Sequence, residues 1–268
     1  MRKLFLEMGN YAKGDSEERS KDLIFVSRLY SRFIADFKIT NLRKITIDMT
    51  DVYGDKTMIT GVNRLSPVCI INKAFNWEDY ETEAEQIARY KVLLDFMHGA
   101  VLEAAERFEW PKELFEKAYA ESLATGFTNE YVIVRPKSSK DRRHVASVLA
   151  RHSRDYVAII VELKNKKDES ETNQIELMKV NFGEDVFSGI VHKIKWVSNG
   201  DLVISNKDEE INFRMSVQDG NAEMFLTPRI HSQEYLQDEL KILDPDVPKE
   251  EKLWILQQRL MDLTGGLA

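Results

Sequence analysis

The stretch WEDYETEAEQIARYKVLLDFMHGAVLEAAERF, residues 77–108, decides the fold that we expect for the first half of this chain. It contains no proline and only one glycine, Gly99. Apolar residues recur in it at intervals of seven, which is typical of one face of a long helix. The members of this series are Tyr80, Ile87, Leu94, Val101 and Phe108. We therefore expect residues 77–108 to form one long helix.

Two shorter helices and a small sheet are expected around this helix. Residues 16–37 and residues 111–126 carry apolar side chains at intervals of three and four, which predicts two amphipathic helices. Three short apolar runs, at residues 45–49, 57–60 and 68–71, are separated by turn residues and predict a small antiparallel meander. Residues 1–126 are therefore expected to form a helix-rich α+β domain.

The second half has a different sequence pattern, in which short runs of β-branched and aromatic residues are separated by turn residues. Asn199-Gly200 and Asp219-Gly220 predict hairpins, because these residue types tolerate the positive φ angles of a type I′ turn. Residues 127–268 are expected to form a mainly antiparallel β-sheet or half-barrel with a C-terminal helix, and this domain can share one core with the first. The helix is expected at residues 248–268, where an apolar seam contains Leu253, Leu256, Leu260 and Leu263.

Charge is distributed unevenly along the chain. The formal net charge is −7, yet residues 135–154 carry seven basic residues and one acidic residue, a local charge of +6. The basic residues are Arg135, Lys137, Lys140, Arg142, Arg143, Arg151 and Arg154. Periodicity allows this basic stretch to form either a short helix with a solvated outer face or the two strands of a hairpin. Such a field can steer a negatively charged partner, either an acidic protein or a phosphate, or it can meet the chain's own acidic regions.

Cysteine content and hydropathy indicate the cellular compartment in which the protein is expected. Cys69 is the only cysteine and lies in an apolar run, so we expect it to be buried, and no intrachain disulfide can form. No apolar stretch approaches the roughly 20 residues needed to cross a bilayer, and the N-terminal residues show no secretory signal. These features predict a cytoplasmic protein that does not bind a membrane.

The familiar signatures of enzymes and cofactor sites are absent from the sequence. It contains no phosphate-binding glycine loop, dinucleotide fingerprint, metalloprotease histidine pair or serine nucleophile elbow. Asp48, Asp51 and Asp55 gather at the end of a predicted strand, where carboxylates can hold a hard cation, but an ordinary solvated acidic turn is favoured. We therefore expect no metal and no cofactor.

The strongest enzymatic candidate is Glu162-Leu163-Lys164, which ends an apolar run. On a strand, Glu162 and Lys164 emerge on the same side. This resembles the acid-x-lysine half of the restriction-endonuclease-like nuclease signature. The resemblance implies that Glu162 holds magnesium, that Lys164 helps to activate water, and that Asp155 or Asp141 supplies the upstream carboxylate. Neither aspartate follows the proline that is usual in that family, and the favoured interpretation is a buried strand ending in a solvated charge pair.

The acidity outside the basic stretch favours protein recognition over chemistry. The remaining residues sum to −13, and such a field attracts basic partners and disfavours nucleic acid. We therefore expect a non-catalytic intracellular protein-binding protein, of the kind that neutralises a toxin as an immunity protein does. Two alternatives are a metal-dependent nuclease or other phosphodiester-handling enzyme and an assembly component that pairs through its C-terminal helix. The predicted binding residues are Arg142, Arg143, Arg151, Arg154, Asp168, Glu169, Glu171, Asp208, Glu209 and Glu210.

Overall fold

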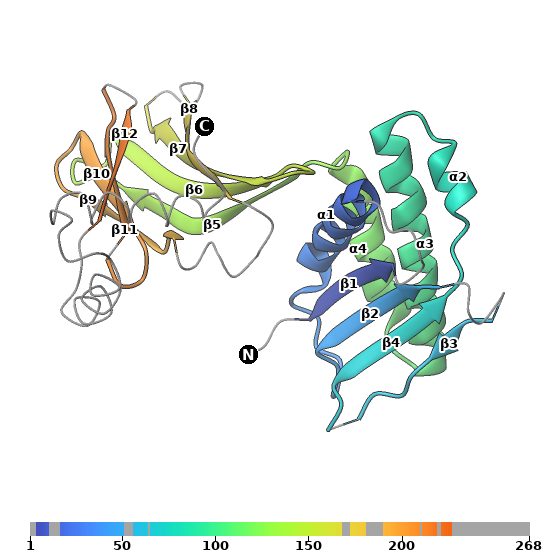
Figure 1. Cartoon of the computed structure of the whole chain (residues 1–268). Coiled ribbons are helices and arrows are strands. Elements are labelled where there is room, and N and C mark those ends of the chain that lie inside the picture. Colours follow the sequence, from blue (N-terminus) through green and yellow to red (C-terminus); the bar gives the residue numbers. More distant parts are fainter. Residues whose placement is uncertain are drawn as a thin grey trace, which may run out of the picture. The chain divides into compact units, whose positions relative to one another are not determined.

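The protein is described by a computed structural model. The described residues are 4–10, 17–50, 56–63, 65–167, 172–180, 190–209, 211–218 and 221–226. Two compact units make up the chain, Met1–Asn129 and Glu130–Ala268, and their boundary lies three residues after the expected one at residue 126 (Figure 1). Each unit is described by itself.

The first unit contains a mainly parallel sheet with strand order β1-β2-β4-β3. Strands β1 (Phe5–Asn10), β2 (Lys44–Met49) and β4 (Val68–Lys73) run parallel, and the short β3 (Met58–Ile59) pairs antiparallel with β4. The predicted antiparallel meander is therefore wrong. In a meander β3 would pair with both β2 and β4. Instead, β3 pairs only with the outer edge of β4, and β4 pairs with β2 in the parallel direction.

Four helices cover one face of this sheet (Figure 1). They are α1 (Glu17–Ile34), α2 (Trp77–Glu81), α3 (Gln86–Arg107) and α4 (Lys112–Ala124). Because four strands share the unit with them, the expected helix-rich half is also wrong. Within the described part of the chain, none of the helices is both long and apolar enough to span a membrane.

The expected single helix at residues 77–108 is interrupted between α2 and α3. The Nη1 atom of Arg89 donates to the carbonyl oxygens of Glu83 and Ala84, at 3.1 and 3.2 Å, and so satisfies two backbone groups at the interruption. The buried carboxylate of Asp22 lies 3.6 Å from Nε of Arg89 and accepts a hydrogen bond of 2.6 Å from the hydroxyl of Tyr80. Contacts with α1 therefore stabilise a break that the spacing of apolar residues does not reveal.

The core of the first unit lies between the sheet and the helices. Alternate strand residues are buried there, including Leu6, Ile47 and Ile71, and they pack with Tyr30 of α1 and Phe115 of α4. Cys69 belongs to the same core, so its predicted burial is confirmed. The side chains that alternate with these lie on the sheet face opposite to the four described helices (Figure 1).

The second unit contains two separate four-stranded sheets. The first has the order β5-β6-β7-β8, with β5 (Asn129–Ser138), β6 (His144–His152), β7 (Val157–Asn165) and β8 (Thr172–Val180). The second has the order β12-β11-β10-β9, with β9 (Lys193–Trp196), β10 (Asp201–Ser205), β11 (Ile211–Ser216) and β12 (Ala222–Leu226). The expected single sheet or half-barrel is therefore wrong. Residues from both sheets, such as Val148, Val161 and Phe213, form one core, because two separate sheets can each bury one apolar face against the other.

The turn signals predict one strand pairing but not the turn geometry. Strands β9 and β10 pair antiparallel, as Asn199-Gly200 predicts. Positive φ angles among the described residues occur at Asn41, Glu109, Gly126, Phe127, Arg142 and Glu209, so Asn199 and Gly200 do not form a type I′ turn. Instead, Oγ of Ser198 accepts hydrogen bonds from the backbone N–H groups of Gly200 and Asp201.

Two expectations for the second half fall on residues that the structure does not describe. The Asp219-Gly220 turn lies there, although the flanking strands β11 and β12 do pair antiparallel. The C-terminal helix expected at residues 248–268 lies there too, so the described fold contains no C-terminal helix.

Candidate binding site at one end of the second unit

The basic stretch at residues 135–154 forms parts of the neighbouring strands β5 and β6 and the turn between them. The hairpin interpretation of this stretch is therefore confirmed, and the short-helix interpretation is wrong. Lys140, Arg142 and Arg143 lie in the turn before β6, whereas Arg151 and Arg154 lie near its other end. Nine residues of strand separate these ends by about 27 Å. The basic stretch is therefore not one patch in space.

Asp141 organises the turn between β5 and β6. Its Oδ1 atom accepts hydrogen bonds from the hydroxyl of Ser139, at 2.7 Å, and from the backbone N–H of Arg143, at 3.1 Å. The Ser139 hydrogen bond is the main cause that lowers the pKa of Asp141 from its usual value. The backbone N–H of Asp141 donates to Oδ1 of Asn199 in the second sheet, at 3.1 Å. This network holds the exposed side chains of Arg142 and Arg143 at one end of the unit.

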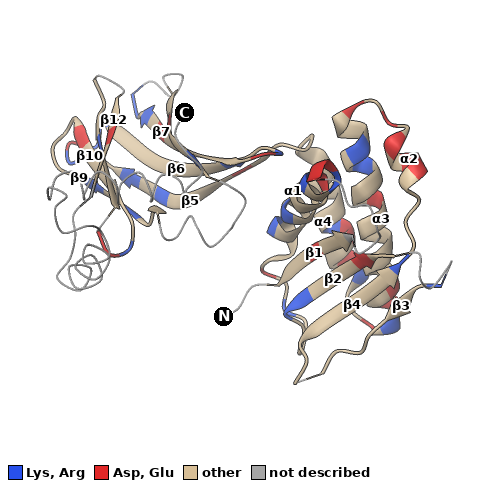
Figure 2. Cartoon of the chain, in the orientation of Figure 1, with Lys and Arg blue, Asp and Glu red and all other residues tan. Residues whose placement is uncertain are grey.

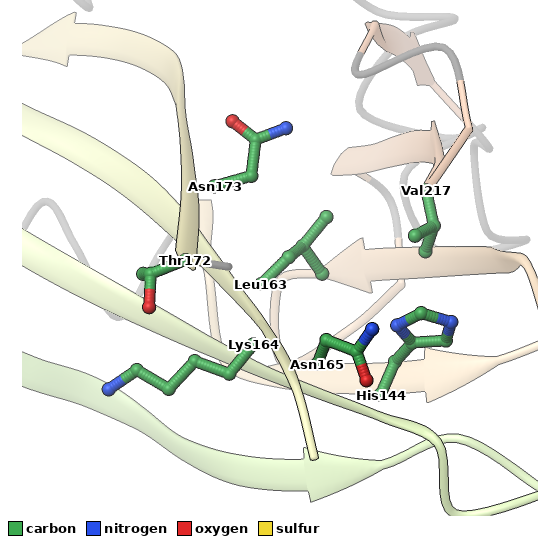
Figure 3. Close-up of a pocket in the computed structure, with 7 residues that line it drawn as sticks. All are labelled: His144, Leu163, Lys164, Asn165, Thr172, Asn173 and Val217. Atoms are coloured by element: carbon green, nitrogen blue, oxygen red, sulfur yellow. The ribbon is translucent and has the colours of Figure 1, made fainter. Parts of the chain in front are cut away.

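Beside this turn lies a cavity of ≈ 340 Å³, here called the inner cavity (Figure 3). Strand register brings its lining together, because Asn165 pairs with His144 of β6 and Leu163 pairs with Asn173 of β8. Val217, which follows β11, comes from the second sheet. The full lining is His144, Leu163, Lys164, Asn165, Thr172, Asn173 and Val217.

A second depression, here called the outer hollow, adjoins the inner cavity and has a volume of ≈ 570 Å³. Lys164 and Thr172 are paired residues of β7 and β8, and the Lys164 side chain extends away from His144 (Figure 3). Lys164, Asn165 and Thr172 line both depressions, whereas Val145 and Lys166 line the outer hollow alone. The described lining of the outer hollow is Val145, Lys164, Asn165, Lys166 and Thr172.

Basic residues outnumber acidic residues at this end of the unit, which we call the basic end. It comprises the turn at residues 139–143 and the last residues of β7 with the two that follow, and the charged residues of these two segments are Lys140, Asp141, Arg142, Arg143, Glu162, Lys164, Lys166 and Lys167. The turn and the end of β7 are adjacent, because the backbone N–H of Lys166 donates to the carbonyl oxygen of Arg143 at 2.8 Å. Figure 2 shows basic residues at the end of β7. In these two segments six cations stand against two carboxylates, with Asp201 of the second sheet at the same end, and the excess of cations favours an anionic ligand.

The residues of the nuclease hypothesis come together only in part. Glu162 and Lys164 lie on the same side of β7, as predicted, with Nζ 2.8 Å from Oε2. Asp155 lies in the turn before β7, and the strand from Val157 to Glu162 alone spans about 17 Å. Asp141 is at the basic end, but its carboxylate accepts the turn hydrogen bonds. Among the described residues, no group of three or more His, Cys, Asp and Glu side chains could hold a metal ion.

The remaining predicted binding residues are dispersed. Arg151 bridges two strands, with Nε 2.5 Å from Oε2 of Glu130 and Nη2 2.7 Å from Oε1 of Gln174. Arg154 is half-buried in the turn between β6 and β7. Asp208 and Glu209 are exposed in the turn between β10 and β11, where Glu209 pairs with Lys193. Asp168, Glu169, Glu171 and Glu210 lie outside the described residues, as do Asp51 and Asp55 of the acidic turn.

Sequence reasoning missed several residues of this site. His144, Asn165 and Asn173 come from three strands and meet only through strand register, which the sequence does not specify. Lys166 could have been found from the sequence. It lies two positions after Lys164, and on an extended segment such residues point to the same face.

Comparisons of the chain with protein-family models, with curated proteins and with solved structures find no match. The function is therefore argued from the geometry and charge of the basic end.

Proposed function

We propose that this protein is a non-catalytic binding protein that recognises an acidic surface on a protein partner through the basic end. The observation that carries this proposal is the gathering of six cations from two separate segments of the chain, the turn at residues 139–143 and the end of β7. Opposite charge across an interface accelerates association and fixes the orientation of the partners. Cations that surround a depression can receive a projecting acidic group.

The local charge of the basic end supports an acidic partner at this surface more directly than a basic one. Residues 130–226 of the sequence carry 15 basic and 16 acidic residues, a formal charge of −1, so an acidic partner is supported by the cations gathered at the basic end and not by the charge of the whole unit. The toxin-neutralising hypothesis relies on acidic clusters, and most of these lie outside the described residues. Glu209, which is described, already pairs with Lys193. The basic end is therefore the better supported binding surface.

A protein partner is also better supported than nucleic acid. Proteins that bind single strands place aromatic side chains where bases can stack. Trp196 directly precedes the turn at residues 197–200 of the second sheet, which lies beside the basic end. Its side chain is buried, and its Nε1 donates to the carbonyl oxygen of Lys137, so it offers no exposed ring for stacking. In the sequence, Lys167 is followed directly by Asp168 and Glu169, so the cations form a short group and not the continuous track that a phosphate backbone follows. Mixed charge suits a discrete acidic surface.

The experiment measures binding of the full chain to a fluorescent polyglutamate peptide of about 20 residues, with single-stranded DNA of equal charge as the comparison. The test variant reverses three cations of the basic end: Arg142→Glu, Arg143→Glu and Lys166→Glu. The control variant reverses three exposed lysines elsewhere in the unit: Lys179→Glu, Lys195→Glu and Lys207→Glu. Both variants change the net charge equally.

We expect the test variant to bind polyglutamate at least tenfold more weakly and the control variant to bind within about threefold of the original protein. A tenfold change corresponds to about 1.4 kcal/mol, or less than 0.5 kcal/mol for each reversed charge. Equal weakening in both variants would show that only net charge matters and would reject the basic end as a site. Tighter binding of DNA than of polyglutamate would reject a protein partner.

A phosphodiester-handling enzyme is a second candidate, because Glu162 and Lys164 contact each other in the acid-x-lysine arrangement. Its test is cleavage of labelled DNA and RNA with magnesium or manganese by the original protein and by Glu162→Ala. Cleavage that the substitution abolishes would support the enzyme, whereas no cleavage by either protein would reject it.

A further inference from the structure

We propose that the outer hollow binds a single oxyanion group, either a carboxylate or a phosphate. This inference rests on the proposed function, because the bound group would be the point at which an acidic partner is anchored. The hollow is formed where β7 ends, β8 begins and β6 starts, so its polar side chains are fixed by two strand pairings.

The chemistry of the lining selects a negative ligand. Lys164 and Lys166 each carry an ammonium group with three N–H donors and no acceptor. Thr172 adds a hydroxyl donor, and Asn165 adds an amide. No aspartate or glutamate belongs to the described lining of the hollow. A depression whose described lining holds two lysines and no carboxylate attracts an anion and disfavours a cation.

Among the described residues, the carboxylate of Glu162 near the hollow reduces the positive charge without cancelling it. Oε2 of Glu162 lies 2.8 Å from Nζ of Lys164 and 3.4 Å from the hydroxyl of Ser147, so it neutralises one of the two lysines. Lys166 is exposed, and no described carboxylate forms an ion pair with it. Within the described part of the unit, Lys166 therefore supplies the net charge, and Lys164 supplies N–H donors that its contact with Glu162 does not use.

Two backbone contacts fix the segment that presents Lys166. Its own N–H donates to the carbonyl oxygen of Arg143, at 2.8 Å. The next N–H, of Lys167, donates to Oδ1 of Asn165, at 3.0 Å. This Asx-type turn orders the chain just after β7 and orients the Asn165 side chain. A site with an ordered backbone loses less conformational entropy when a ligand binds.

The size and apolar content of the hollow suit one acidic group on a short aliphatic stem. Its volume of ≈ 570 Å³ exceeds that of a phosphate or a carboxylate alone, and Val145 provides an apolar wall. A glutamate side chain of the partner offers a carboxylate with two methylene groups, and a phosphorylated side chain or free phosphate offers the same kind of oxygen acceptors. Oxyanion recognition is common to these sources.

The test is a nuclear magnetic resonance titration of the full chain with glutarate and, separately, with inorganic phosphate, with ionic strength held constant by sodium chloride. The observed signals are the side-chain amide of Asn165 and the backbone amides of Lys166 and Thr172. We expect saturable shifts with at least one anion and none with chloride. Lys166→Glu should weaken binding at least tenfold, Thr172→Val several-fold, and the matched control Lys195→Glu less than twofold.

Each outcome bears on the inference. Tighter binding of glutarate supports a partner carboxylate, and tighter binding of phosphate supports a phosphate group. Shifts that do not saturate, or equal weakening by Lys166→Glu and Lys195→Glu, would overturn the site. If polyglutamate binds the basic end while both small anions leave the three signals unchanged, the oxyanion site alone is rejected. If the small anions bind while polyglutamate does not, the proposed function alone is rejected.

Discussion

Replacing Asp22 with alanine should destabilise the first unit strongly, because it removes the acceptor at the break between α2 and α3. Asp22 is fully buried, accepts a 2.6 Å hydrogen bond from Tyr80 and lies 3.6 Å from Nε of Arg89. Removing one partner of a buried ion pair costs about 3–5 kcal/mol. The Arg89 side chain is 23% exposed, so water recovers part of this loss. We expect Asp22→Ala to lower the free energy of unfolding by about 3 kcal/mol.

The assay is urea unfolding followed by circular dichroism at 222 nm, because all four described helices belong to the first unit. Tyr80→Phe removes only the hydroxyl and should cost about 1 kcal/mol. Asp36→Ala changes an exposed aspartate just after α1 and should stay within about 0.5 kcal/mol of the original protein. A loss below about 1 kcal/mol in Asp22→Ala would refute the stabilising role of this contact.

Other substitutions and titrations test separate parts of the structure. Burial raises the pKa of Cys69 to about 11, so a thiol reagent at pH 8 should modify it only after unfolding, and rapid modification of the native protein would contradict the buried position. Burial lowers the pKa of His98, so the free energy of unfolding should fall as pH decreases below about 6.5, and His98→Gln should flatten this fall in urea titrations. Burial and, secondly, the Glu7 carboxylate raise the pKa of Asp48, whose Oδ1 is buried without a hydrogen bond. Asp48→Asn should therefore increase the free energy of unfolding at pH 7 but not at pH 3, and an equal effect at both would contradict this cause.

The sequence predicts strand positions in the first unit better than strand directions. The alternation of Ile45, Ile47 and Met49 locates β2, and all three side chains are buried. Direction depends on the path between strands, and α1 connects β1 to β2 as a crossover long enough for parallel pairing. Hydroxyl groups of Ser27 and Ser31 in α1 accept hydrogen bonds from backbone N–H groups of β1. The order strand, helix, strand was visible in the sequence and favours parallel pairing over a meander.

The failure of the long-helix prediction has a tertiary cause. Spacing by sevens extends from Tyr80 to Ile87 across the break, yet Ile87 is exposed in the structure while Tyr80 is buried. Asn76 caps α2 through a hydrogen bond from the backbone N–H of Glu78, and Arg89 binds the carbonyl oxygens that follow. Side chains of Asn76 and Arg89 thus bind backbone groups that a continuous helix would satisfy by itself. The spacing of apolar residues does not reveal these polar contacts.

The sequence predicted only the part of the candidate site that depends on alternation along one strand. Alternation placed Glu162 and Lys164 on one side of β7, and their contact confirms this. The pairing of β7 with β6 and β8 then decided which residues joined them. A hairpin also separated the basic stretch into two groups, because residues at opposite ends of β6 cannot form one surface.

The backbone conformation of Arg142 allows its charge to be removed without a loss of stability. Its φ angle is 62°, a conformation that costs a residue with a Cβ atom about 1 kcal/mol and that glycine adopts freely. Glu209, with a φ angle of 61°, offers a matched comparison in another turn of the same unit. Arg142→Gly and Glu209→Gly should both leave stability unchanged or raise it by up to about 1 kcal/mol. Only Arg142→Gly should weaken polyglutamate binding, because it removes a cation of the basic end and Glu209→Gly does not. Unchanged binding of Arg142→Gly would show that this cation does not contribute to the site.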